Sequence, residues 1–244
     1  MWAGHLGAAL ALERADRELS LGWLFLAAQL QDVILWALVL AGIEHVTIPA
    51  DYATRHYLHF DFPYSHSLRA SVAFTVLAGL LTLLVTGRRT AGKRRWRAAG
   101  LVAAAVFSHF VLDVIVHPAE PLPSGNSTIG MGLWDAMPLA IAIELAITFG
   151  GLALWRRGAV RNDCVGVRGV IVLVVVVAAL TVAGLTVAPV PGSVTSLAVT
   201  SLVSALAVSA VAGKLDRTPR AGAESGGVEG PRRRQGLPSS ASPP

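Results

Sequence analysis

Apolar residues occur along this chain in long blocks separated by short charged stretches. Five of the blocks have the roughly 20 residues that an α-helix needs to cross the ~30 Å hydrocarbon core of a bilayer. They lie at about 20–43, 69–87, 98–117, 134–155 and 168–190. A sixth block, at about 194–213, is rich in Ser, Thr and Ala, small residues that allow helices to pack closely. The pattern predicts an all-α, polytopic transmembrane bundle of about six spans.

Two short segments complete this pattern. The sequence Pro-Val-Pro-Gly at 189–192 cannot continue a helix, so it predicts a tight hairpin between the fifth and sixth spans. Residues 2–12 are apolar but too short to cross a bilayer, and their charged residues follow at 13–18 instead of preceding them as in a signal peptide. We therefore expect an uncleaved N-terminus. It forms either an interfacial helix or a half-helix that enters the bundle and returns at 13–18.

The composition agrees with a membrane protein. Hydrophobic residues make up 54% and charged residues 14% of the 244 positions, and the mean hydropathy is +0.60. A water-soluble globule has about a quarter charged residues. The single cysteine, Cys164, excludes a disulfide framework. Residues 214–244 are rich in Pro, Gly, Ser and Arg and predict a disordered tail after a transmembrane domain at 1–213.

The net charge of +5 reflects membrane topology. The 88–97 stretch has six basic residues and no acid, and 156–168 has four arginines, so both loops are predicted to be cytoplasmic. The loops at 43–67 and 118–130 carry mainly acids and are predicted to face outward. The C-terminal tail is then cytoplasmic, in a bacterial inner membrane. No nucleic-acid partner is expected, because the positive charge lies where topology requires it.

Ionisable residues inside the spans give the main functional signal. His109 and Asp113 are four residues apart and share one helix face. Asp32 and His66 reach a similar depth from the first span and from the outer end of the second. Because an ionisable residue in hydrocarbon is costly, function is the first hypothesis for such a group. Imidazoles with carboxylates suit zinc, manganese or iron, and such a metal indicates hydrolysis, with a further carboxylate as general base.

Other interpretations of these residues remain open at this level. His109 and Asp113 could form a hydrogen-bonded pair that only fastens two helices in a non-catalytic scaffold. A proton- or ion-coupled transporter would use a relay through Asp32, His109, Asp113 and Glu144. The remaining polar and aromatic candidates have simpler explanations. His45, His56 and His59 lie in an outer loop, His117 precedes Pro118 at a helix end, and Trp134 and Trp155 fit an interfacial aromatic belt.

Four short motifs occur in a recognisable order. They are Gly4-His5-Leu6, Leu30-Gln31-Asp32, Ser65-His66-Ser67 and Ser108-His109 followed by Asp113. Over about residues 1–155 the chain resembles the LexA-regulated, membrane-bound, predicted metal-dependent hydrolases, a family distantly similar to the zinc-dependent phospholipase C and P1 nuclease group. The resemblance implies a divalent metal, zinc or manganese, bound by His5, Asp32, His66, His109 and Asp113. It also favours the half-helix for residues 3–12, because His5 then reaches the depth of Asp32.

The chain departs from the family pattern at two places. Asp61-Phe62-Pro63 puts Asp61 where the family has a histidine, and Asp32 lacks the second acid and the histidine that follow it in the family. Asp61 and Glu144 are the predicted supporting catalytic carboxylates, and Glu144 could instead orient a metal-bound histidine. The resulting hypothesis is a metal-dependent hydrolase in the bilayer that acts on a phosphoester, such as a lipid head group.

Overall fold

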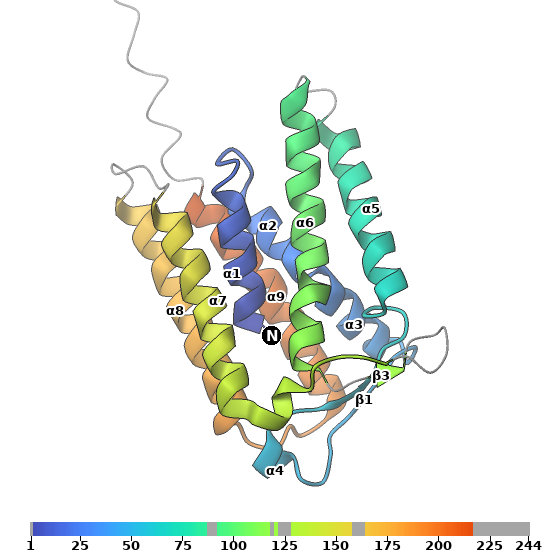
Figure 1. Ribbon diagram of the computed structural model, residues 1–244. Coiled ribbons are helices and arrows are strands. Elements are labelled where there is room, and N and C mark those ends of the chain that lie inside the picture. Colours follow the sequence, from blue (N-terminus) through green and yellow to red (C-terminus); the bar gives the residue numbers. More distant parts are fainter. Residues whose placement is uncertain (1, 87–91, 118–119, 122–127, 158–163, 217–244) are drawn as a thin grey trace, which may run out of the picture.

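The computed structural model describes residues 2–86, 92–117, 120–121, 128–157 and 164–216, and over these ranges the chain is an all-α bundle (Figure 1). The predicted fold class is confirmed. The main helices are α1 (Trp2–Glu13), α2 (Leu21–Ala28), α3 (Leu30–Leu40), α5 (Leu68–Thr86), α6 (Lys93–Val116), α7 (Met137–Arg157), α8 (Cys164–Thr186) and α9 (Val194–Asp216). The predicted tail lies outside the described residues from 217 onward.

Short elements join the helices at the end opposite to the start of α6. Strand β1 (His45–Thr47) pairs antiparallel with β2 (His59–Asp61), with the one-turn helix α4 (Tyr52–Arg55) between them. A second pair consists of β3 (Glu120–Pro121) and β4 (Thr128–Ile129), and the 3-10 turn η1 (Leu133–Ala136) leads into α7. The hairpin predicted at 189–192 is present, since α8 ends at Thr186 and α9 begins at Val194.

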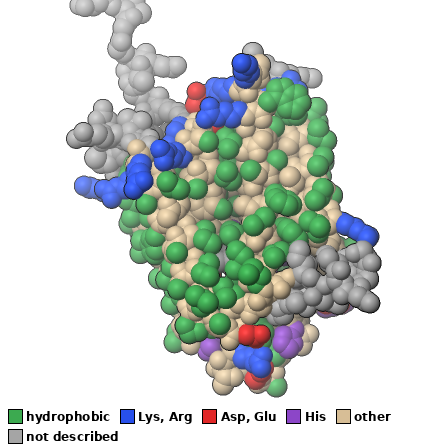
Figure 2. Space-filling model, viewed as in Figure 1, with side chains coloured by type: hydrophobic (Ala, Val, Ile, Leu, Met, Phe, Trp, Pro, Cys, Tyr) green, Lys and Arg blue, Asp and Glu red, His purple; other side chains and the backbone are tan. Residues whose placement is uncertain are grey.

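The lengths and apolar character of the helices indicate a multi-pass membrane protein. Among the described residues, five helical segments are long enough to cross a bilayer and have mean hydropathies of 1.9 to 2.7 over their most apolar windows, and α2 with α3 gives a sixth. Apolar side chains cover the face shown in Figure 2, and Lys and Arg gather at the end where α6 begins. We call this the basic end, and it carries Lys93, Arg94, Arg95, Arg97, Arg156 and Arg157.

The first predicted span is not one continuous helix. It is divided into α2 and α3, which meet at Gln29 with a bend of 55°. The Gln29 side chain is fully buried, and its Nε2 donates to the carbonyl of Phe25 at 3.1 Å. Its Oε1 accepts a hydrogen bond of 2.8 Å from Trp2 Nε1. A side chain that inserts into the backbone ladder kinks a helix, so the bend is explained by the buried amide of Gln29.

The N-terminal segment is a half-helix inside the bundle, and the interfacial alternative is wrong. Most of helix α1 is buried, with Ala3, Leu6 and Leu10 at 0% exposure, and none of its described residues is exposed. It begins near the centre of the bundle and runs toward the basic end (Figure 1). It packs on α7 at a pair of glycines, where a Cβ on Gly151 would lie 2.0 Å from the Gly7 carbonyl oxygen. The turn that follows is held at the basic end, where Arg97 donates to the Ala15 carbonyl.

A pair of glycine substitutions tests this packing. We expect Gly151→Ala to lower the free energy of unfolding by about 1–3 kcal/mol, because the added methyl group overlaps the backbone of α1. Gly100→Ala on α6 is the control, because a Cβ there meets nothing within 4 Å. Thermal unfolding of the purified variants measures the difference. Equal stability of the two variants would contradict the close approach of α1 and α7.

Candidate metal centre

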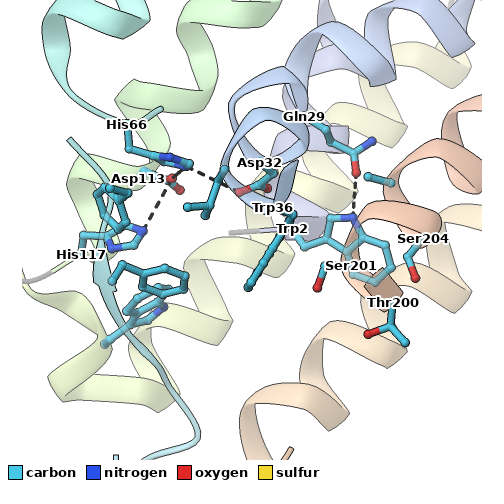
Figure 3. Close-up of a pocket in the computed structure, with 15 residues that line it drawn as sticks. Trp2, Gln29, Asp32, Trp36, His66, Asp113, His117, Thr200, Ser201 and Ser204 are labelled. Carbon is cyan, nitrogen blue, oxygen red and sulfur yellow. Dashed lines mark hydrogen bonds and ion pairs between the residues drawn. The ribbon is translucent and has the colours of Figure 1, made fainter. Parts of the chain in front are cut away.

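Four segments of the chain bring histidine and aspartate side chains to one place in the bundle. His5 comes from α1, Asp32 from α3, His66 from the turn before α5, and His109 and Asp113 from α6. Figure 3 shows Asp32, His66 and Asp113 pointing toward one another. His5 and His109 are fully buried, and Asp113 and His66 are 7% and 8% exposed. The five predicted metal ligands therefore form one cluster, the His/Asp cluster.

Ligand atoms of Asp32, His66 and His109 lie within 4.8 Å of one another, and Asp113 lies close to both imidazoles. The Nε2 atoms of His66 and His109 are 3.1 Å apart, and Asp113 Oδ2 lies 3.1 Å from His109 Nε2 and 3.5 Å from His66 Nε2. Asp32 Oδ1 lies 3.5 Å and 3.7 Å from the same two nitrogens. A tetrahedral site with bonds of ~2.0–2.1 Å places neighbouring ligand atoms about 3.3 Å apart. The donor set and its spacing fit a divalent cation such as zinc.

His5 extends the cluster on the side of α1. Its ring stacks on His109 with centroids 3.9 Å apart, and its Nε2 lies 3.3 Å from Asp113 Oδ1. The side chain is fully buried, and within the described residues the other ring nitrogen, Nδ1, makes no hydrogen bond. A buried polar atom without a hydrogen bond costs about 1–3 kcal/mol, and a bound ion is one way to satisfy it. His5, His109 and Asp113 form a second group whose ligand atoms lie within 4.8 Å of one another.

The orientation of the His109 ring is fixed by the bend between α2 and α3. Its Nδ1 donates a hydrogen bond of 2.8 Å to the carbonyl of Ala28, the last residue of α2. Carbonyls at a helix end have no partner within the helix, so this one is available to accept. A neutral imidazole that carries its proton on Nδ1 has a lone pair on Nε2. The lone pair of His109 therefore points into the cluster, as metal-binding histidines require.

His66 is held by Ser65, its neighbour in the Ser65-His66-Ser67 motif, and by Glu44, for which the sequence predicted no role. Ser65 Oγ lies 2.8 Å from His66 Nδ1, which leaves Nε2 toward the cluster. Glu44 is 1% exposed, and its Oε1 accepts hydrogen bonds of 2.8 Å from the backbone N–H groups of Tyr64 and Ser65. Glu44 thus fixes the turn that presents His66. No signal in the sequence separates Glu44 from the other acids of the outer loop.

Neither predicted supporting carboxylate lies in the cluster. Asp61 is exposed on β2, where it pairs with His45, and the next residue, Phe62, takes the buried position. Glu144 on α7 is 3% exposed, and its Oε1 accepts a hydrogen bond of 3.3 Å from the backbone N–H of Gly4. Glu144 therefore holds the first turn of α1, which carries His5. Glu144 influences the position of His5 through the backbone of α1, and its carboxylate does not reach the ligand atoms.

His117 and Trp134 lie beside the His/Asp cluster, although the sequence suggested only a helix end for His117 and an interfacial position for Trp134. His117 Nε2 is 3.6 Å from Asp113 Oδ2, and the Trp134 ring is 4.3 Å from the His117 ring. Burial lowers the pKa of His117 and favours its neutral form. Trp134 thus contacts the site as well as lying near the end of a span. His45 and His59 are exposed, as expected for a solvated outer loop.

A pocket of about 310 Å³ opens beside the cluster (Figure 3), in the size range of small-molecule sites. One side presents Asp32, His66, Asp113 and His117, and aromatic rings form much of the rest. The opposite wall is α9, through Thr200, Ser201 and Ser204. The full lining is Trp2, Gln29, Asp32, Leu35, Trp36, Phe60, Phe62, His66, Asp113, His117, Trp134, Thr200, Ser201, Ser204 and Ala205. A ligand in this pocket would meet the cluster at one end and apolar or hydroxyl groups at the other.

No protein-family model, no curated protein and no solved structure matches this chain. The function therefore has to be inferred from the chemistry of the described residues.

Metal analysis of the purified protein tests the cluster. We expect zinc or manganese to be present and to fall at least tenfold in Asp32→Asn, which keeps the side-chain shape and removes the charge. His109→Ala should have the same effect, because it removes the one nitrogen whose lone pair the Ala28 carbonyl orients. His59→Ala is the control, since His59 is exposed on β2. A parent protein without metal would leave the cluster as a hydrogen-bonded fastening between helices.

Glu44 gives a separate prediction as a positioning residue. We expect Glu44→Ala to weaken metal affinity about 10–100-fold, as loss of residues that orient metal ligands typically does. Glu44→Gln should restore most of the affinity, because an amide oxygen can still accept from the N–H groups of Tyr64 and Ser65. Asp51→Ala, which removes an exposed acid of the same loop, is the control. Titration with zinc against a competing chelator measures the constants, and equal affinities for Glu44→Ala and Asp51→Ala would refute the assignment.

Proposed function

We propose that the protein is a membrane-embedded hydrolase that depends on a divalent metal, zinc or manganese, and cleaves phosphoesters such as lipid head groups. The observation that carries this proposal is the convergence of Asp32, His66, His109 and Asp113 at ligand spacing beside a pocket. The proposed location is a bacterial inner membrane, with the basic end and the C-terminal tail in the cytoplasm. The distribution of Lys and Arg supports this orientation.

The roles of the residues follow from their positions. His5, Asp32, His66, His109 and Asp113 would hold the metal, which when bound supplies a Lewis acid and a water of lowered pKa. Asp32 and Asp113 balance the charge of a divalent cation, so the cluster needs no further carboxylate for neutrality. His117 and Trp134 form the pocket wall next to Asp113 and would contact the substrate. In this proposal His117 takes the supporting catalytic role that the sequence predicted for Asp61 and Glu144.

The pocket walls support an amphipathic substrate. Trp36, Phe60 and Phe62 offer apolar contact, and the hydroxyl groups of Ser201 and Ser204 offer hydrogen bonds on the opposite side. Thr200, which also lines the pocket, is exposed on α9. Because α9 is a candidate membrane span, this wall borders the lipid. A lipid with a phosphoester head group would match both ends of the pocket.

Hydrolysis assays test the proposal directly. The purified protein should release product from a panel of phosphate monoesters, phosphate diesters and phospholipid vesicles, lose this activity on chelation and regain it with zinc or manganese. His117→Asn should lower kcat at least tenfold while metal content stays at the parent level, because His117 lines the pocket outside the proposed ligand set. His45→Asn, an exposed histidine, is the control. Metal-loaded protein that cleaves none of these esters would refute hydrolysis.

One observation favours a second candidate, an ion-coupled transporter. The bend at Gln29 divides a membrane span in two beside the His/Asp cluster, and discontinuous helices of this kind form the ion sites of many transporters. In that case the cluster would bind the transported cation. Zinc, manganese or proton flux into proteoliposomes, abolished by Asp32→Asn without any hydrolytic activity in the parent, would favour transport over hydrolysis.

A further inference from the structure

A groove lies between α7 and α8 at the basic end, away from the His/Asp cluster. Its volume is about 500 Å³. Its walls are apolar except at one end, where two consecutive arginines close it. The lining residues are Phe149, Leu152, Ala153, Arg156, Arg157 and Ile171.

The apolar part of the groove is accessible from the bilayer. Phe149 is 42% exposed, and Ala153 is exposed beside it on the outer surface of α7. A Cβ added at Gly150 would meet nothing within 4 Å, so the helix surface is open there. Both α7 and α8 are candidate membrane spans. At this depth the surrounding medium is hydrocarbon, and a lipid acyl chain is the group that fills such a groove.

The charged end of the groove has the opposite chemistry. Arg156 and Arg157 are exposed, and within the described part of the chain neither forms an ion pair with a carboxylate. Arg17 also reaches this end, donating to the Trp155 carbonyl, but it is paired with Glu13 at 2.9 Å. Guanidinium groups bind phosphate through paired hydrogen bonds. These two guanidinium groups, which pair with no carboxylate among the described residues, are complementary to an anionic phospholipid.

We propose that this groove binds one anionic glycerophospholipid, with its phosphate at Arg156 and Arg157 and an acyl chain along Phe149, Leu152 and Ile171. Basic pockets between transmembrane helices at the cytoplasmic surface bind lipids of this class. The site is separate from the His/Asp cluster and does not depend on the proposed hydrolysis. Arginines that only set the membrane topology need to be positively charged, but they need no groove beside them. The effects of the charge and of the shape of the groove can therefore be tested separately.

Native mass spectrometry of the full-length protein in detergent tests the site. The probes are phosphatidylglycerol and phosphatidylcholine with identical acyl chains. We expect one phosphatidylglycerol to bind with roughly tenfold or greater preference over phosphatidylcholine, since only phosphatidylglycerol carries a net negative charge for the two arginines. Arg156→Gln/Arg157→Gln should reduce the preference to about twofold or less. Ala153→Phe should weaken phosphatidylglycerol binding at least fivefold with both arginines intact, because the added ring fills the groove.

The control is Lys93→Gln/Arg168→Gln, which removes two charges from exposed positions outside the groove. We expect its lipid preference to equal that of the parent. Equal binding of the two lipids by the parent would overturn the proposal even if a variant failed to fold. The same holds if the control lost the preference as fully as Arg156→Gln/Arg157→Gln, because general surface charge would then explain the binding.

Discussion

The hydrogen bond from His109 Nδ1 to the Ala28 carbonyl is the interaction on which the site depends most. It requires a carbonyl without a partner in its own helix, and a continuous helix through residues 21–40 would have used this one for its own backbone. The bend at Gln29 releases it, and the buried amide of Gln29 bonds to Phe25 and Trp2 at the same point. A local break in one span therefore sets the direction of a side chain on another.

Contacts between distant segments of the chain also explain why a half-helix occupies the centre of the bundle. His5 can stack on His109 only if α1 enters the bilayer region, and α1 can do so only because glycines at 7 and 151 let two backbones approach. Glu144 then accepts a hydrogen bond from the N–H of Gly4, one of the donors that a helix N-terminus leaves without an internal partner. Glu144 and Gly4 are 140 residues apart in the chain, and their hydrogen bond satisfies a buried backbone donor where no water is at hand.

Much of the fold and part of the site could be predicted from the sequence, for distinct reasons. Long apolar blocks predict membrane spans directly. The spacing of four residues predicts that His109 and Asp113 share one helix face. The bend at Gln29 could not be predicted, because a glutamine in an apolar run gives no sign of which carbonyl it will contact. Asp61 lies outside the His/Asp cluster because it is exposed at the end of β2, while the next residue, Phe62, is buried. Glu44 and His117 take their roles from contacts made only after folding.

The protonation of the ring nitrogens in the His/Asp cluster helps to decide whether the cluster holds a cation. The two Nε2 atoms of His66 and His109 face each other at 3.1 Å, and His109 already carries its proton on Nδ1. Without a cation, such a contact requires a proton on one of the two nitrogens, and the carboxylates of Asp32 and Asp113 require positive charge nearby in a medium of low dielectric constant. A divalent cation held by these residues would remove both requirements at once. It lets both imidazoles stay neutral with their lone pairs inward, and it balances the two carboxylates, which is why the observed spacing supports a metal centre more than a hydrogen-bonded clasp.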